Sequence, residues 1–337
     1  MHKKYSISIV LLLMLLVFGG CAKRSTTKVS FYYWKTVFAL NESERAILKE
    51  TDCAKIYLRY FDVILTKGST EAIPESPITF KDSIGKLELI PVIYIKNEVM
   101  LNDKEDLEKL ADRILDYISQ INKTNKINTS EVQIDCDWTL ASKDNFMKFM
   151  EILKSKTSGR LSATIRLHQI KYAATTGIPN VDYGVLMYYN MGKIAADNSN
   201  SIYDRKIAEK YLSKLSAYPL SLKVAIPMFS WTVQIRSEKV VGLNAKITLK
   251  DLISNDFENV SDNIFTVKRS QYLKGSLLNK HDLLKIEKVS SKELSDIASD
   301  LNKNLKETPA EIIFFDLNEN NIKQYEKSIY KEIATSF

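Results

Sequence analysis

The chain has 337 residues, of which 45% are hydrophobic and 26% charged, with a formal net charge of +7. This is the mixture of an ordinary globular protein, and it excludes a disordered, collagenous or coiled-coil chain. Three cysteines and three histidines exclude a disulfide scaffold and a metal site built from several histidines. No cofactor is predicted, because the sequence has neither a phosphate-binding loop nor a dinucleotide-binding fingerprint.

Residues 1–20 have the pattern of a signal peptide. Two lysines precede an apolar run over 7–18, which is too short to span a membrane as a helix. Small residues directly before Cys21 resemble a lipoprotein processing site, where this cysteine becomes the lipidated first residue. Removal of residues 1–20 takes away these two lysines and lowers the net charge of the mature chain from +7 to +5. We predict a cell-envelope lipoprotein with a tether over 21–28, in the outer membrane because Ala22 is not an inner-membrane retention residue. An ordinary signal peptide or an uncleaved anchor is the alternative.

Eight segments rich in Val, Ile, Phe and Tyr are predicted to be strands. They cover residues 29–34, 54–62, 87–95, 131–138, 161–168, 184–190, 222–230 and 311–317. Amphipathic segments between them predict helices over 42–49, 103–121, 142–156, 203–216, 291–305 and 319–334. Strands that alternate with helices in this way predict a (β/α)8 barrel of the TIM type over residues 29–337.

Two segments depart from the alternation. The second strand is followed by a loop over 63–86 instead of a helix. Residues 235–290 are too long for one connection and contain strand-like runs at 264–273 and 283–289. We therefore predict an inserted hairpin or small α+β lobe between the seventh and eighth barrel strands.

Functional sites of such barrels lie at the C-terminal ends of the strands. The residues predicted there are carboxylates, aromatics and amides, a set that stacks on sugar rings and bonds their hydroxyls. The candidate catalytic residues are Asp62, Asp135, Asp137 and Asp316. The candidate substrate-binding residues are Trp34, Arg59, Arg166, His168, Gln169, Tyr188, Tyr189, Asn190 and Trp231. The alternative is that the aromatic side chains only seal the top of the barrel.

The fourth strand is the most informative. Every second residue of 131–138 is polar, so its apolar face meets the helices and its polar face points into the barrel. Buried carboxylates need partners, and Arg59 and Arg166 are the predicted partners of Asp135 and Asp137. One interpretation is a structural ion-pair network. The other is that Asp135 raises the pKa of Asp137, nearest the mouth, which then acts as an acid or polarising group.

The segment 134–139 (Ile-Asp-Cys-Asp-Trp-Thr) resembles the fourth-strand motif D-G-x-D-x-D-x-E of family 18 glycoside hydrolases, the chitinase-like barrels. Residues 186–190 resemble that family's sixth-strand Met-x-Tyr-Asp, with Asn190 in place of the Asp. The resemblance implies a barrel that handles carbohydrate. Val132 stands where the family has its first Asp, and Thr139 stands where it has its catalytic Glu. Thr139 cannot supply the proton, so the family's ordinary mechanism is lost.

The chain as a whole is similar to a family of bacterial lipoproteins with predicted barrel folds, whose role is not established. The motifs that carry this similarity lie at 31–34, 59–62, 133–139, 164–169 and 229–231.

Three classes of function follow from the sequence. The first is a glycoside hydrolase that uses another carboxylate pair among Asp62, Asp137 and Asp316. The second is a glycan binder without catalysis, and the third is a structural envelope protein.

A metal-dependent hydrolase, with a cation held by carboxylates and His168, is a weaker hypothesis, because barrel metallohydrolases use several histidines. The absence of a G-x-S-x-G motif argues against a serine hydrolase. The predicted partners are a carbohydrate and, through Cys21, a membrane, but not nucleic acid, since no basic patch is interleaved with aromatics.

Overall fold

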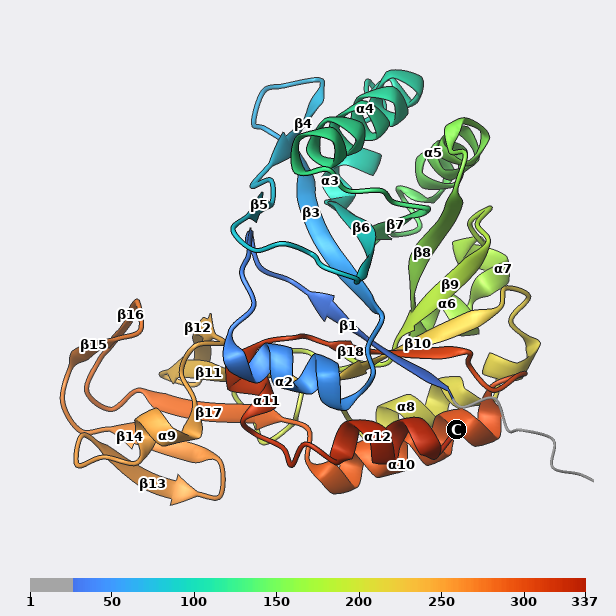
Figure 1. The fold of residues 1–337 in the computed structure, drawn as a ribbon. Coiled ribbons are helices and arrows are strands. Elements are labelled where there is room, and N and C mark those ends of the chain that lie inside the picture. Colours follow the sequence, from blue (N-terminus) through green and yellow to red (C-terminus); the bar gives the residue numbers. More distant parts are fainter. Residues whose placement is uncertain (1–26) are drawn as a thin grey trace, which may run out of the picture.

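The computed structural model describes residues 27–337, and the predicted signal peptide, Cys21 and most of the tether lie outside these residues. Eight parallel strands form a barrel (Figure 1), closed because the first pairs with both the second and the last. They are β1 (Lys28–Tyr33), β3 (Lys55–Leu65), β6 (Glu88–Ile95), β7 (Glu131–Cys136), β8 (Arg160–Arg166), β9 (Tyr183–Met187), β10 (Leu222–Pro227) and β18 (Glu311–Phe315). The predicted barrel and all eight of its strands are confirmed.

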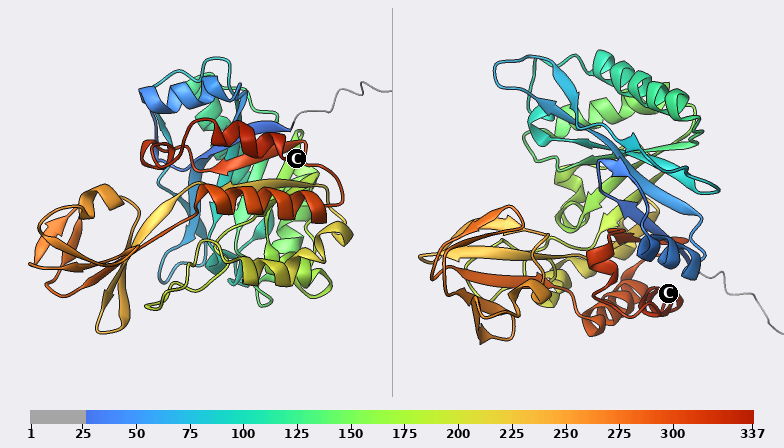
Figure 2. Two further views of the ribbon diagram at one scale, coloured as in Figure 1. Left: turned by 90° about the horizontal axis from the view of Figure 1, so that it is seen from below. Right: turned by 60° about the vertical axis from the view of Figure 1, so that its left-hand side comes forward.

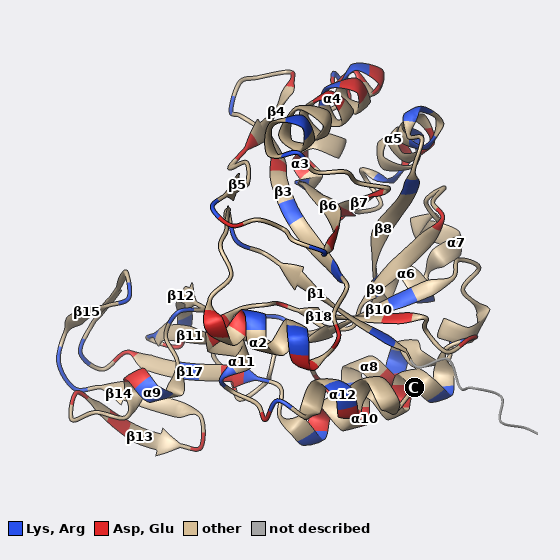
Figure 3. Ribbon diagram, in the orientation of Figure 1, with Lys and Arg blue, Asp and Glu red and all other residues tan. Residues whose placement is uncertain are grey.

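Helices cover the outside of the barrel. They are α2 (Glu42–Glu50), α3 (Asn97–Met100), α4 (Leu107–Asn125), α5 (Lys143–Lys156), α6 (Leu167–Lys171), α7 (Ala173–Thr176), α8 (Arg205–Leu212), α10 (Ser291–Asn304), α11 (Glu319–Ile322) and α12 (Ile329–Thr335). Lys and Arg are mixed with Asp and Glu on α4 and α10 (Figure 3). Among the described residues, no helix is long and apolar enough to cross a membrane.

The loop after β3 contains no helix, as predicted, but it is not unstructured. Its residues form β4 (Ala72–Glu75), which pairs antiparallel with β3, and β5 (Thr79–Phe80), which pairs with β2 (Val37–Phe38). The predicted helix over 319–334 is divided into α11 and α12 by a turn. The predicted strand over 161–168 is too long, because α6 begins at Leu167.

The insertion is a separate α+β lobe, which confirms the prediction. Its sheet contains β11 (Ser230–Arg236), β12 (Lys239–Asn244), β13 (Phe257–Ser261), β14 (Ile264–Val267) and β17 (Leu283–Lys288). Helix α9 (Leu249–Leu252) and a hairpin of β15 (Gln271–Leu273) and β16 (Ser276–Leu278) complete it. The lobe has its own small hydrophobic core, which includes Phe265 and Leu284. It projects from one side of the barrel (Figure 2).

The barrel interior is polar at its lower end, where the strands begin. The Lys223 ammonium lies 2.6 Å from the Glu311 carboxylate, and the Tyr57 hydroxyl donates to the same carboxylate over 3.1 Å. Glu131 accepts a hydrogen bond from Tyr183 and pairs with an arginine at the barrel rim. The inward polar face predicted for the fourth strand is therefore confirmed.

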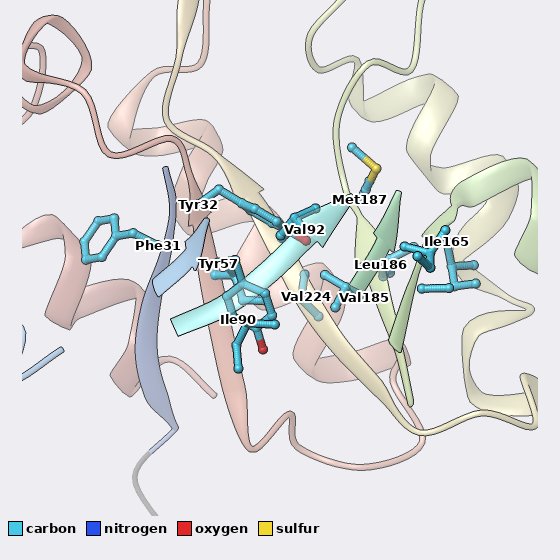
Figure 4. Close-up of a cluster of buried hydrophobic side chains, with 14 of the residues drawn as sticks. Phe31, Tyr32, Tyr57, Ile90, Val92, Ile165, Val185, Leu186, Met187 and Val224 are labelled. Carbon is cyan, nitrogen blue, oxygen red and sulfur yellow. The ribbon is translucent and has the colours of Figure 1, made fainter. Parts of the chain in front are cut away.

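The outer side of the strands packs on the helices with apolar side chains. Along β1, Phe31 and Tyr32 point to opposite sides of the strand (Figure 4). Phe31 packs against Phe314 and Tyr330, with ring centroids 5.7 and 5.5 Å away. Tyr32 points inward and donates a hydrogen bond to Gln133. The same alternation positions the side chains at the upper end of the barrel.

Candidate functional site at the barrel mouth

The two aspartates of the fourth strand lie at the barrel mouth. Asp135 is buried near the end of β7 and accepts a hydrogen bond from the Thr164 hydroxyl over 2.7 Å. Asp137 follows the strand, and its half-exposed carboxylate forms an ion pair with Arg166, the last residue of β8. The predicted pair of Asp137 and Arg166 is confirmed.

The carboxyl whose pKa is raised at the mouth is that of Asp135. Burial, and secondly the negative charge of Asp137, raise the pKa of Asp135 to about 6. The Thr164 hydrogen bond and the charge of Arg166 act in the opposite direction. Asp135 can therefore hold or release a proton close to neutral pH, although its side chain is covered.

Arg59 does not pair with Asp135, and this part of the prediction is wrong. Its guanidinium lies 2.7 Å from the carboxylate of Asp62, and it also donates to the carbonyl of Ser76 over 3.2 Å. Residues three apart on a regular strand point to opposite sides, but the pairing of β3 with β6 shifts register between Arg59 and Phe61. This bulge allows Arg59 to reach Asp62, so no cation among residues 27–337 forms an ion pair with Asp135.

Five aromatic side chains form a row across the mouth, here called the aromatic row. Tyr94 and Trp34 have ring centroids 6.4 Å apart, and Trp34 lies 5.5 Å from Phe315. Phe315 lies 5.6 Å from Phe229, which lies 5.1 Å from Trp231. All but Phe229 are half-buried, so they offer partly exposed rings to solvent.

Tyr189 lies beneath the aromatic row. Its ring packs on Phe315 and Phe229, with centroids 5.3 and 5.7 Å away. Its buried hydroxyl has no hydrogen-bond partner among the described residues. Burial, and then the charge of Asp135, raise the pKa of Tyr189 well above its usual value. Tyr188, its neighbour, points to the other side of the barrel wall and packs near Tyr203.

Three predicted substrate-binding residues lie on or after the loops that leave the barrel. His168 is exposed on α6, and partial desolvation, then the charge of Arg166, lower its pKa. Gln169 is fully buried, and its side chain accepts a hydrogen bond from the backbone N–H of Arg166 over 2.8 Å. It is therefore not accessible to a ligand. Asn190 is exposed at the start of the loop after β9, with a positive φ of 55°.

Asp316 is not part of the cluster around Asp135. Its carboxylate accepts a hydrogen bond from Asn321 in the turn of α11, and burial raises its pKa to about 6. Thr139 is exposed in the loop after β7, where its backbone N–H donates to Ser142 over 2.9 Å. Its hydroxyl lies 3.4 Å from the Ser142 hydroxyl, so this position offers a hydrogen bond but no acid.

Sequence reasoning missed Phe315 and the buried residues that hold Trp231. The signal for Phe315 was present, because Glu311, Ile313 and Phe315 alternate on one face of β18 and Glu311 is inward. Trp231 donates its indole N–H to the carboxylate of Glu287, a lobe residue, over 2.9 Å. No pattern near Trp231 in the sequence indicates that partner.

A metal centre is not formed by the described residues. They contain no group of three or more His, Cys, Asp or Glu side chains that could hold an ion. In particular, His168 is exposed on α6 and Asp316 faces α11, apart from the Asp135 and Asp137 pair.

No protein-family model and no curated protein sequence matches the chain. Among solved structures, the spore cortex-lytic enzyme SleL of Bacillus megaterium QM B1551 is similar, with a TM-score of 0.57 and 12% identity, covering 92% of this chain and 74% of that one. The GH18 chitinase of Cycas revoluta in complex with (GlcNAc)3 has a TM-score of 0.51 and 13% identity, covering 92% of this chain and 99% of that one. These identities show a shared fold alone. The chain therefore has the TIM-type barrel of GH18 chitinases, and the resemblance to a lipoprotein family stays a prediction.

Proposed function

We propose that the barrel mouth binds a glycan containing N-acetylglucosamine units and does not hydrolyse it. The aromatic row carries this proposal, because neighbouring aromatic rings, four of them partly exposed, offer a surface on which sugar rings can stack. Asp137 and Arg166 lie close to Tyr94 of the row, and Asn190 lines a small pocket with Tyr189. These side chains offer acceptors and donors for hydroxyl and acetamido groups. The GlcNAc oligomer in the chitinase of similar fold supports the choice of sugar.

The state of the carboxylates supports binding over hydrolysis. Asp137 is neutralised by Arg166 and Asp62 by Arg59, while Asp316 faces α11. Glycoside hydrolysis needs a protonated acid within hydrogen-bond reach of the glycosidic oxygen. Thr139 occupies the position after the strand at which the chitinase-like motif has its catalytic Glu.

The test is calorimetric titration of the chain from residue 22 with (GlcNAc)3 to (GlcNAc)6, followed by product analysis. Trp34→Ala and Trp231→Ala should each weaken binding by about 2 kcal/mol, roughly 30-fold, because central aromatic contacts dominate binding energy. Tyr272→Ala is the matched control, since this exposed aromatic lies on the lobe hairpin away from the mouth. Binding that is equally strong in all three variants would contradict the proposal.

One observation favours a hydrolase as the second candidate. The pKa of about 6 at Asp135 is suited to proton transfer near neutral pH, and Asp137 lies two residues away. Hydrolysis would release shorter oligosaccharides over hours, and Asp137→Asn and Asp135→Asn would each abolish their release. Product formation in the unmodified chain and its loss in both variants would replace the binding proposal by this one.

We further propose that Cys21 is lipidated and anchors the protein to a membrane of the cell envelope. The position of Lys28 supports it, because this first residue of β1 pairs with Glu311 at the lower end of the barrel, opposite to the mouth. A short tether there leaves the mouth facing away from the membrane. Mass spectrometry of the N-terminal peptide tests it: the unmodified chain should carry acyl groups on residue 21, and Cys21→Ser should carry none and leave the membrane fraction.

A further inference from the structure

Two oppositely charged side chains are fully buried in the inserted lobe, beside the barrel mouth. Lys285 and Glu287 lie two residues apart on β17, are 0% and 1% exposed, and are 2.7 Å apart. Burial of two charges costs several kcal/mol per ion unless each is surrounded by further polar partners. Their partners show which part of the molecule they hold in place.

The Lys285 ammonium is surrounded by main-chain oxygens from a single loop. It donates to the carbonyls of Ala195, Asp197 and Ser199 over 2.9, 2.8 and 2.8 Å. These carbonyls come from alternate residues, so the loop curls around the ammonium. The three carbonyls accept the three N–H donors of the ammonium group, and Glu287 supplies the opposite charge beside it.

Glu287 connects the same loop to the aromatic row. Its carboxylate accepts hydrogen bonds from the backbone N–H of Ser201, over 3.1 Å, and from the Ser201 hydroxyl. It also accepts the indole N–H of Trp231 over 2.9 Å. Hydrogen bonds to a charged acceptor are roughly twice as strong as neutral ones. Burial acts to raise the pKa of Glu287, but the contact with Lys285 and the bonds from Ser201 and Trp231 outweigh it and hold this pKa below its usual value.

The loop held in this way is the one that begins with Asn190. Residues 190–201 contain no helix or strand, so no regular backbone pattern fixes their shape. Backbone hydrogen bonds within the loop close only its base, where the Asn190 N–H donates to Ile202 over 2.8 Å and the Gly192 N–H to Ser201 over 3.2 Å. In the middle of the loop, Asp197 accepts a local hydrogen bond from the Ser199 N–H over 2.9 Å. The three bonds from Lys285 and the bond from Asn200 to the Lys288 carbonyl tie this part of the loop to the lobe.

We propose that Lys285 and Glu287 are a positioning pair that sets one side of the mouth. Lys285 orders the loop 190–201, and Glu287 fixes Trp231 relative to that loop. The ordering of the loop stands on the contacts above, whereas its consequence for glycan affinity rests on the proposed function. Neither residue touches the sugar; both act through Trp231 and the loop.

The test compares Lys285→Met and Glu287→Gln with the unmodified full chain, purified in a mild detergent. Lys274→Met is the matched control, because this lobe lysine pairs with Asp251 and with a lobe carbonyl and does not contact the loop. Trypsin cleavage after the exposed Lys193 reports on the loop, and cleavage after the exposed Lys239 in the lobe reports on general loosening. The ratio of the two rates isolates the loop from overall stability.

Lys285→Met should raise this ratio roughly tenfold, and Glu287→Gln should raise it less. The fluorescence of Trp231, obtained by subtraction of a Trp231→Phe spectrum, should move to longer wavelength in both variants. Should Lys285→Met fail to fold, Glu287→Gln alone decides. A cleavage ratio and a Trp231 spectrum equal to those of Lys274→Met would overturn the proposal.

Glycan affinity is measured in the same variants with (GlcNAc)4. Lys285→Met should bind it at least about fivefold more weakly than the unmodified chain, because an ordered loop lowers the entropy cost of binding. Were the unmodified chain to bind no glycan, the proposed function would fail, while the cleavage ratio would still decide whether the pair orders the loop.

Discussion

Replacing Lys223 by Met should destabilise the barrel strongly and in a pH-dependent way. The Lys223 ammonium is the only cation within 4 Å of the buried Glu311 carboxylate among the described residues. It also donates to the Tyr57 hydroxyl over 2.8 Å and lies 3.9 Å from the centre of the Tyr183 ring. Methionine keeps most of the side-chain volume, so packing changes little and the charge is what the experiment removes.

The magnitude follows from the burial of both partners. The side chains of Lys223 and Glu311 are 13% and 7% exposed, and removal of one member of a buried pair costs about 3–5 kcal/mol. Burial acts to raise the pKa of Glu311, but the charge and hydrogen bond of Lys223 outweigh it, so this pKa lies below its usual range. Burial lowers the pKa of Lys223, and the attraction of Glu311 only partly opposes this shift.

The pH dependence has opposite signs in the two proteins. In the unmodified chain the lowered pKa of Glu311 contributes stability above its unfolded value, and this is lost as pH falls through the folded pKa. In Lys223→Met, burial is left to raise that pKa, so the variant gains stability as Glu311 is protonated in acid. The stability difference should therefore be largest near neutral pH and shrink towards acid.

Urea unfolding of the chain from residue 22, followed by circular dichroism between about pH 4 and pH 8, measures this difference. Lys331→Met is the control, because its contact with Glu50 is an exposed one of 3.7 Å worth at most about 1 kcal/mol. Lys223→Met with Glu311→Leu should recover much of the loss, since a buried pair is replaced by apolar groups. A loss below about 1 kcal/mol that does not change with pH would refute the reasoning.

Three further changes test other parts of the molecule. Asn41→Ala removes the side chain that accepts the Glu44 N–H over 2.9 Å at the start of α2 and should cost about 0.5–2 kcal/mol by thermal unfolding. Arg236→Met removes two hydrogen bonds of 2.7 and 2.8 Å to the buried Asp282 and should destabilise the lobe, seen as early hydrogen exchange confined to the lobe. Because the pKa of Asp135 is raised to about 6, the free energy of unfolding should fall as pH rises through about 6, and it should not fall in this way in Asp135→Asn.

The barrel could be predicted because each strand carries its own signal. Alternation of polar and apolar residues along 131–138 fixes which side faces inward, and parallel neighbours then bring Asp137 and Arg166 together. The same reasoning failed for Arg59, because it assumes a regular strand. A bulge in β3 changes the side on which residues point, and nothing in the sequence of that strand marks its position.

The partners of Trp231 could not be predicted for a different reason. Lys285 and Glu287 lie on one face of a recognisable strand. In the sequence, two charged residues at alternate positions indicate a solvent-exposed face, although both are buried. What makes them buried is a loop about ninety residues earlier in the chain, and an irregular loop has no periodicity that shows what it covers.

Buried carboxylates at the two ends of the barrel differ in how many partners they have, and this difference supports the proposed ligand at the mouth. At the lower end, Glu311 has a cation and hydroxyl donors, and its pKa is lowered. At the mouth, the described residues give Asp135 one side-chain donor, the Thr164 hydroxyl, and leave the Tyr189 hydroxyl without a partner. The pKa of Asp135 is raised to about 6. Unsatisfied buried polar groups cost about 1–3 kcal/mol each. A bound sugar that reaches the Tyr189 hydroxyl would recover that energy, whereas Glu311 already has its partners.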